Sequence, residues 1–261
     1  MQTDNDFSTR AIFNKVPEIT LVFWIIKIMA TTVGETAADL LSDTLGLGLV
    51  VTSWVMAALL VLTLIVQFRT KKYVPVVYWV VVVFISVVGT LISDNLVDNM
   101  GVSLVTTSII FAIALAVVFI AWYAVEKTLS VHTICTTRRE FFYWAAILFT
   151  FSLGTSAGDL LSERLGLGYP LSALLFAAAI AVIFAAYRMG ANGVLTFWLA
   201  YILTRPLGAS LGDLLTQDKA NGGLGIGTIP VSAVFLVVIV VLVIHLTREE
   251  NKHPQHAMSV S

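Results

Sequence analysis

Long apolar segments separated by short polar connections follow one another along the chain. A helix needs roughly 20 apolar residues to cross the hydrocarbon core of a membrane, and eight segments are of about this length. They predict helices at about 19–42, 47–68, 75–97, 102–124, 141–162, 169–188, 194–215 and 228–246. The expected fold class is all-α, a polytopic membrane domain of eight transmembrane helices at 19–247 between tails at 1–18 and 248–261.

The amino-acid composition agrees with a membrane protein and limits the kinds of site that the chain can form. The 261 residues are 58% hydrophobic and only 12% charged, whereas soluble domains carry about 25% charged residues. Cys135 is the only cysteine, so neither a disulfide nor a thiolate metal site is expected. We expect no cofactor and no nucleic acid. The expected partners are the lipid bilayer, a small cation or other small solute, and in an oligomer a second copy of the chain.

The cations lie mostly on one side of the predicted membrane domain. Eleven of the 15 Lys and Arg residues fall in the termini and the connections after even-numbered helices: Arg10, Lys15, Arg69, Lys71, Lys72, Lys127, Arg138, Arg139, Arg188, Arg248 and Lys252. Cytoplasmic loops carry an excess of Lys and Arg. This side, with both termini, is therefore expected to face the cytoplasm, and nine of the 16 acidic residues lie on or near the opposite side.

A motif recurs four times at fixed spacing. Each copy has the pattern Trp-x9-Gly-x4-Asp near the start of a two-helix unit: Trp24, Gly34 and Asp39; Trp79, Gly89 and Asp94; Trp144, Gly154 and Asp159; Trp198, Gly208 and Asp213. Such a period indicates internal repeats, at about 19–70, 71–126, 140–190 and 191–247. Since each unit crosses the membrane twice, the copies run in parallel, and the four odd-numbered helices, called the motif helices, can face one another.

Within each motif helix the polar residues are stacked one turn apart. The aspartate that ends the motif is followed four residues later by a second polar residue: Asp43, Asp98, Glu163 or Gln217. Residues four apart share a helix face, so the motif helices would build an inner ring of Asp39, Asp94, Asp159 and Asp213 and an outer ring above it. The alternative is that these acids only end helices at the water interface, which explains them poorly because aspartate at a helix C-terminus opposes the macrodipole.

Two small residues four apart lie on each motif helix just before the aspartate. They are Gly34 and Ala38, Gly89 and Ser93, Gly154 and Gly158, and Gly208 and Gly212. Small residues at this spacing let helices approach closely in lipid. The four motif tryptophans lie near the cytoplasmic ends of their helices, where we interpret them as anchors at the headgroup level.

Two cations fall inside apolar spans and have no counterpart in the other repeats. Lys27 and Arg205 would each cost roughly 3 kcal/mol or more at the bilayer centre, so both are expected to act as internal counter-ions to acids on the motif helices. In the repeat alignment Arg205 lies one turn from the level of Glu35, which predicts an Arg205–Glu35 pair. Pro206 removes a helix hydrogen bond and predicts a kink or break in this helix.

The motifs resemble those of a known family. Four tandem two-helix units with Trp-x9-Gly-x4-Asp, with "KIMATTVGET" in the first and "LTRPLGASLGDLL" in the last, look like a group of bacterial integral membrane proteins known as a repeat of unknown function. The resemblance implies a bacterial inner-membrane location and an eight-helix fold. It implies no activity.

The polar residues favour a transporter or channel-like protein for a small cation. Carboxylates suit hard divalent cations such as Mn²⁺ or Mg²⁺, and proton coupling through a carboxylate is an equal option. The expected ion-binding residues are Glu35, Asp39, Asp43, Asp94, Asp98, Asp159, Glu163 and Asp213, with the inner ring as the metal site. The alternatives are a carrier of a small organic or anionic solute held by Lys27 and Arg205, and an accessory membrane protein without flux. No catalytic motif is present, so an enzyme is not expected.

Overall fold

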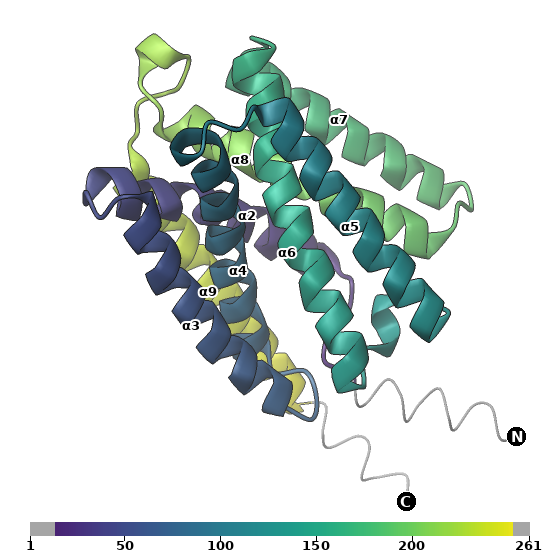
Figure 1. The fold of residues 1–261 in the computed structure, drawn as a ribbon. Coiled ribbons are helices and arrows are strands. Elements are labelled where there is room, and N and C mark those ends of the chain that lie inside the picture. The colour runs from purple at the N-terminus through teal and green to yellow at the C-terminus, as the bar shows by residue number, and fades with distance from the viewer. Residues whose placement is uncertain (1–13, 253–261) are drawn as a thin grey trace, which may run out of the picture.

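The computed structural model describes residues 14–252, and within this range the chain is helical without strands (Figure 1). The long helices are α2 (Leu21–Asp39), α3 (Leu49–Arg69), α4 (Pro75–Asp94), α5 (Leu104–Glu126), α6 (Thr137–Asp159), α7 (Gly168–Arg188), α8 (Gly193–Thr216) and α9 (Thr228–Lys252). Over the described range eight helices are long and apolar enough to span a membrane. The predicted all-α, multi-pass membrane fold is confirmed.

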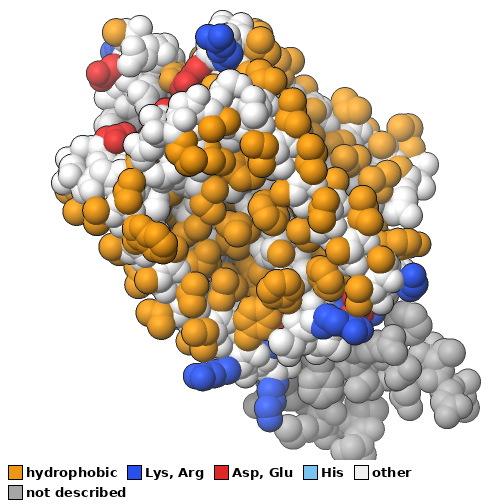
Figure 2. Space-filling view, viewed as in Figure 1, with side chains coloured by type: hydrophobic (Ala, Val, Ile, Leu, Met, Phe, Trp, Pro, Cys, Tyr) orange, Lys and Arg blue, Asp and Glu red, His pale blue; other side chains and the backbone are white. Residues whose placement is uncertain are grey.

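The motif helices α2, α4, α6 and α8 form an inner ring. Each packs against the next, and α8 packs against α2, so that the ring is closed. Their apolar spans are 61–67% buried, whereas those of α3, α5, α7 and α9 are only 17–22% buried. The second helix of each repeat therefore lies outside, where it presents the apolar surface that covers the middle of the molecule (Figure 2).

Each outer helix packs mainly on the motif helix of the following repeat. Helix α3 lies on α4, α5 on α6 and α7 on α8, and the C-terminal helix α9 returns to pack on α2. The repeats are consequently interlocked: within the described residues, each motif helix packs far more on the second helix of the preceding repeat than on its own. Closure between α9 and α2 completes a cyclic arrangement in which the four motif helices run in the same direction, as the repeat spacing predicts.

The motif glycines allow this close packing. A side chain added at Gly34 would overlap Ser86, one at Gly89 would overlap Phe151, one at Gly154 would overlap Arg205, and one at Gly208 would overlap Thr31. Each of these neighbours lies three residues before the glycine of the next repeat, so the same contact occurs four times around the ring. At Gly158, by contrast, the nearest atom would be 3.5 Å away, which is ordinary contact.

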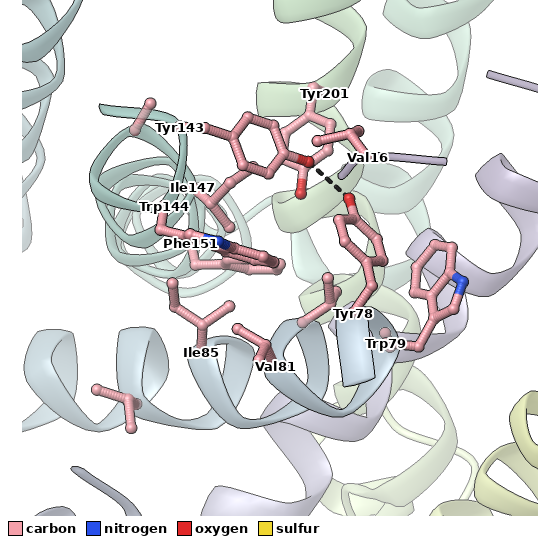
Figure 3. Close-up of a cluster of buried hydrophobic side chains, with 14 of the residues drawn as sticks. Val16, Tyr78, Trp79, Val81, Ile85, Tyr143, Trp144, Ile147, Phe151 and Tyr201 are labelled. Atoms are coloured by element: carbon pink, nitrogen blue, oxygen red, sulfur yellow. Dashed lines mark hydrogen bonds between the residues drawn. The ribbon is translucent and has the colours of Figure 1, made fainter. Parts of the chain in front are cut away.

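The motif tryptophans pack inside the ring instead of anchoring it to headgroups. Trp79 is 1% exposed and Trp144 and Trp198 are each 4% exposed, so the interpretation as lipid anchors is wrong for these three. The residue before each tryptophan is aromatic, and it packs against the tryptophan of the next repeat. The ring pairs are Phe23–Trp79, Tyr78–Trp144, Tyr143–Trp198 and Phe197–Trp24, with centroids 5.5 to 6.2 Å apart. Figure 3 shows Tyr78 and Trp144 of the second pair.

The two predicted tails partly belong to the folded domain. Lys15 is buried, and its Nζ donates to Glu140 Oε2 at 2.6 Å and to the carbonyl of Phe68 at 3.2 Å. The chain is thus packed into the bundle several residues before α2 begins, and α9 continues past the predicted boundary at 247 to Lys252. The rest of the predicted tails, 1–13 and 253–261, lies outside the described residues.

Candidate functional site

The acidic residues of the motif helices line a cavity of about 170 Å³ at one end of the ring. Its polar lining, here called the acidic pocket, consists of Glu35, Asp39, Ser42, Asp43, Asp94, Asp98, Asp159, Glu163, Asp213 and Gln217. Every predicted acidic site residue is therefore brought together. The pocket lies at the end of the molecule where most of the acidic side chains are seen in Figure 2, whereas most of the Lys and Arg side chains in this view lie at the opposite end.

The two predicted rings occupy different depths of the acidic pocket. Asp39, Asp94 and Asp159 are half-buried and Asp213 is buried, whereas Asp43, Asp98 and Glu163 are exposed at the mouth and Gln217 is half-buried. This difference matters electrostatically, because an exposed carboxylate is solvated by water and a buried one is not. A bound cation would therefore stabilise the carboxylates of the inner ring more than those at the mouth.

The carboxylates that converge most closely differ from the predicted inner ring. One oxygen from each of Glu35, Asp159 and Asp213 lies within 4.8 Å of the other two. Of the predicted metal set of Asp39, Asp94, Asp159 and Asp213, only Asp159 and Asp213 belong to this close group, while Asp39 and Asp94 line the pocket beside it. Glu35 takes part because it lies one turn deeper on α2 and reaches the pocket floor.

Below the floor, Arg205 joins all four motif helices. Its Nη2 donates to Glu35 Oε2 on α2 at 2.5 Å, to Thr155 Oγ1 on α6 at 2.8 Å, and to Thr90 Oγ1 on α4. Its Nη1 lies 3.4 Å from the carbonyl oxygen of Thr31, and the side chain is fully buried. The predicted Arg205–Glu35 ion pair is present. A guanidinium suits this position because its planar fork presents several donors in fixed directions.

The acidic pocket holds many carboxyl groups and no cationic side chain among its lining residues. Arg205 pairs from below with Glu35 alone among the carboxylates. The side chains of Asp39, Asp94, Asp159 and Asp213 are thus clustered without a cationic partner in the described structure. Clustered carboxylates in a low dielectric repel one another, and the repulsion is relieved when protons or a cation bind between them.

Lys27 has no carboxylate partner, contrary to the prediction that it is a counter-ion. Its Nζ lies 4.1 Å from the ring centroids of both Phe151 and Tyr201, and no described residue forms a hydrogen bond with it. The nearest predicted acid, Glu35, is eight residues along the same helix and is bound to Arg205. In the repeat alignment Tyr201 occupies the position of Lys27 and Phe151 lies one turn further along its own helix, but the alignment does not tell which side chains meet Lys27 between the helices.

Three other features of the motif helices differ from what the sequence predicts. Thr90 and Thr155 were not predicted, although they occupy the position of Glu35 in the second and third repeats, which is a signal that could have found them. Helices α2, α4 and α6 continue past the aspartate as π-helical turns, Leu40–Thr44, Asn95–Asn99 and Leu160–Arg164. The predicted break at Pro206 is absent, since α8 runs through it.

The Arg205–Glu35 pair predicts strong coupling between two substitutions. Arg205→Met and Glu35→Gln should each destabilise the protein, by about 3–5 kcal/mol when a buried charge is left without its partner. Arg205→Met should cost more, since it also removes the contacts to Thr90 and Thr155. The double variant should lose clearly less than the sum, as measured by unfolding of purified protein in a double-mutant cycle. Additive losses would contradict the pair.

Comparison with known proteins places the chain among the repeat proteins that it resembles. The family described as "Repeat of Unknown Function (DUF347)" matches residues 22–73, 77–128, 142–190 and 196–252, which correspond to the four structural repeats. Neither the curated proteins nor the solved structures that were searched gave a match. With most of its length covered by four tandem copies, the chain belongs to the DUF347 repeat family, whose function is unknown.

Proposed function

We propose that the protein transports a small cation, which binds on the floor of the acidic pocket. The observation that carries this proposal is the convergence of Glu35, Asp159 and Asp213, whose carboxylate oxygens lie within 4.8 Å of one another. Buried acids between membrane helices are costly and usually mark an ion path. The closed ring of motif helices holds the three residues on three different elements, as a site between parallel repeats requires.

A divalent cation fits this site better than a monovalent one. Three carboxylates carry up to three negative charges, of which Arg205 compensates one through Glu35. The remaining charge matches an ion such as Mn²⁺ or Mg²⁺, both of which prefer oxygen ligands. Asp39 and Asp94 lie beside the trio in the same pocket and can complete the coordination directly or through water.

The alternative of an anionic solute receives no support from the positions of the two interior cations. The guanidinium of Arg205 donates to Glu35, Thr90 and Thr155, and the ammonium of Lys27 faces two aromatic rings. Neither residue lines the acidic pocket. A solute carboxylate entering this pocket would meet no cationic side chain among its lining residues. A non-transporting accessory protein remains the competing outcome of the flux measurement below.

We propose a bacterial inner-membrane location with the acidic pocket facing outward. The basic residues Arg69, Lys71 and Lys72 lie on the connection at the opposite end, and such residues are retained in the cytoplasm. Cysteines introduced at Lys71 and Leu45, both exposed, in a Cys135→Ser background test this. An impermeant thiol reagent should label the Leu45 position in intact cells and the Lys71 position only after lysis; the reverse pattern would overturn the orientation.

Cation binding should stabilise the purified protein. At 100 times its dissociation constant, a ligand stabilises the folded state by about 2.7 kcal/mol, so Mn²⁺ or Mg²⁺ should raise the unfolding temperature by several degrees. Asp159→Asn and Asp213→Asn should abolish the shift, whereas Asp43→Asn at the exposed mouth should keep most of it. Because protons compete with the metal for carboxylate oxygens, the shift should diminish as the pH falls.

Two outcomes would refute cation binding on the floor of the acidic pocket. An unfolding temperature that no divalent or monovalent cation raises would remove the cation site, and equal shifts in Asp213→Asn and wild type would place binding elsewhere. Transport itself requires flux: proteoliposomes containing the protein should take up Mn²⁺ faster than empty liposomes, and Asp213→Asn should return uptake to the empty rate. Binding without flux would make the protein a non-transporting cation-binding membrane protein.

A further inference from the structure

Lys27 is a buried amine that the cation site does not use. It is 1% exposed and lies on α2 eight residues before Glu35, about 12 Å deeper at 1.5 Å per residue. Its Nζ has no hydrogen-bond partner among the described residues. Instead it contacts the ring faces of Phe151 from α6 and Tyr201 from α8, each with the centroid 4.1 Å away. The side chain therefore points into the centre of the ring, below the acidic pocket.

Polar groups extend from Lys27 toward the basic end of the bundle. Tyr201, Tyr143 and Tyr78, from α8, α6 and α4, are fully buried and lie together in Figure 3. The hydroxyls of Tyr78 and Tyr143 are 2.6 Å apart. One turn from Tyr143 on α6 lies Glu140, which is bonded to Lys15 at 2.6 Å. Hydroxyl and charged groups thus lie between the amine and the basic end, here called the column, although Lys27 Nζ and the Tyr201 hydroxyl have no hydrogen-bond partner among the described residues.

Toward the acidic pocket the column continues through hydroxyl groups with unused hydrogen-bonding capacity. Ser86 on α4 and Ser152 on α6 are buried, and their Oγ atoms have no partner in the described structure. Ser86 lies against Gly34 of α2, between the levels of Lys27 and Glu35. Above it are Arg205, Thr90 and Thr155 at the pocket floor. Unsatisfied buried hydroxyls of this kind commonly hold water.

Of the two cations inside the apolar spans, Arg205 and Lys27, Lys27 is the one that can change its charge, whereas Lys15 at the basic end of the column is paired with Glu140. Arg205 remains protonated in proteins and is fixed by Glu35. A lysine can release its proton when it is buried, and the two ring faces offset only part of the cost of burying its charge. The charged groups that face it are Arg205 above and, farther along the column, the Glu35 and Glu140 carboxylates, each of which is already paired.

We propose that Lys27 is the proton-carrying residue that couples cation transport to proton movement in the opposite direction. This inference rests on the proposed function. When a cation occupies the pocket, added positive charge favours loss of one N–H proton from the Lys27 ammonium to water in the column. When the pocket is empty, the lone pair on Nζ accepts a proton from water again. Only the N–H bond breaks and forms, and one proton is exchanged per cycle at this residue.

The test uses the full-length protein in liposomes that contain a pH-sensitive dye, with Mn²⁺ as the probe. In the wild type, Mn²⁺ uptake should be accompanied by a change in internal pH, and an imposed pH gradient should accelerate uptake. Lys27→Met and Lys27→Arg should keep the Mn²⁺-dependent rise in unfolding temperature but lose pH-driven uptake by about tenfold or more. Arginine is informative because it keeps the charge and cannot release the proton.

The matched control is Ile147→Met, which changes a buried side chain at the equivalent position of the third repeat. It should leave coupling intact. Proton-driven uptake that persists in Lys27→Met or Lys27→Arg would overturn the inference, and if Lys27→Met fails to fold, Lys27→Arg decides. Mn²⁺ uptake by the wild type without any proton movement would refute the coupling and leave the proposed function standing. Absence of both fluxes would refute both.

Discussion

The buried guanidinium of Arg205 is the constraint on which the inner ring depends. Burying a charge in this position is costly unless the charge is paired and hydrogen-bonded. The partners of Nη1 and Nη2 come from α2, α4 and α6, while Arg205 itself belongs to α8. The four motif helices must therefore approach one another at this level. Gly154 makes the approach sterically feasible, because any side chain there would overlap Arg205. Charge and small residues thus act together to fix the ring.

Around this centre, the same contacts recur from one repeat to the next. The motif glycine packs against the residue three before the next glycine, the aromatic residue before each tryptophan packs on the next tryptophan, and each outer helix covers the next motif helix. The repeats are similar in packing but not in chemistry. Glu35, Lys27 and Arg205 each occur in one repeat only, so the four similar repeats enclose a polar interior that is not symmetrical. The converging carboxylates accordingly include Glu35 with Asp159 and Asp213 and do not form a fourfold ring.

The helices, the inner position of the motif helices and the Arg205–Glu35 pair could be predicted from the sequence, because they depend on periodic features. Apolar length predicts the eight helices, and the Trp-x9-Gly-x4-Asp spacing predicts which four lie inside. Aligning the repeats also places Arg205 one turn from Glu35, so their pairing follows once α2 and α8 are neighbours. What could not be predicted depends on which side chains meet between helices. The aromatic surroundings of Lys27, the burial of the tryptophans and the choice of converging carboxylates all arise from packing that the spacing does not specify.

A structure of the protein crystallised with Mn²⁺ would decide whether the floor of the acidic pocket binds a divalent cation, because the anomalous scattering of Mn²⁺ locates the metal. We expect a peak coordinated by carboxylate oxygens of Glu35, Asp159 and Asp213, with Arg205 still bonded to Glu35. A peak confined to the exposed acids at the mouth, Asp43, Asp98 and Glu163, or no peak at a saturating Mn²⁺ concentration, would show that the floor does not bind the ion.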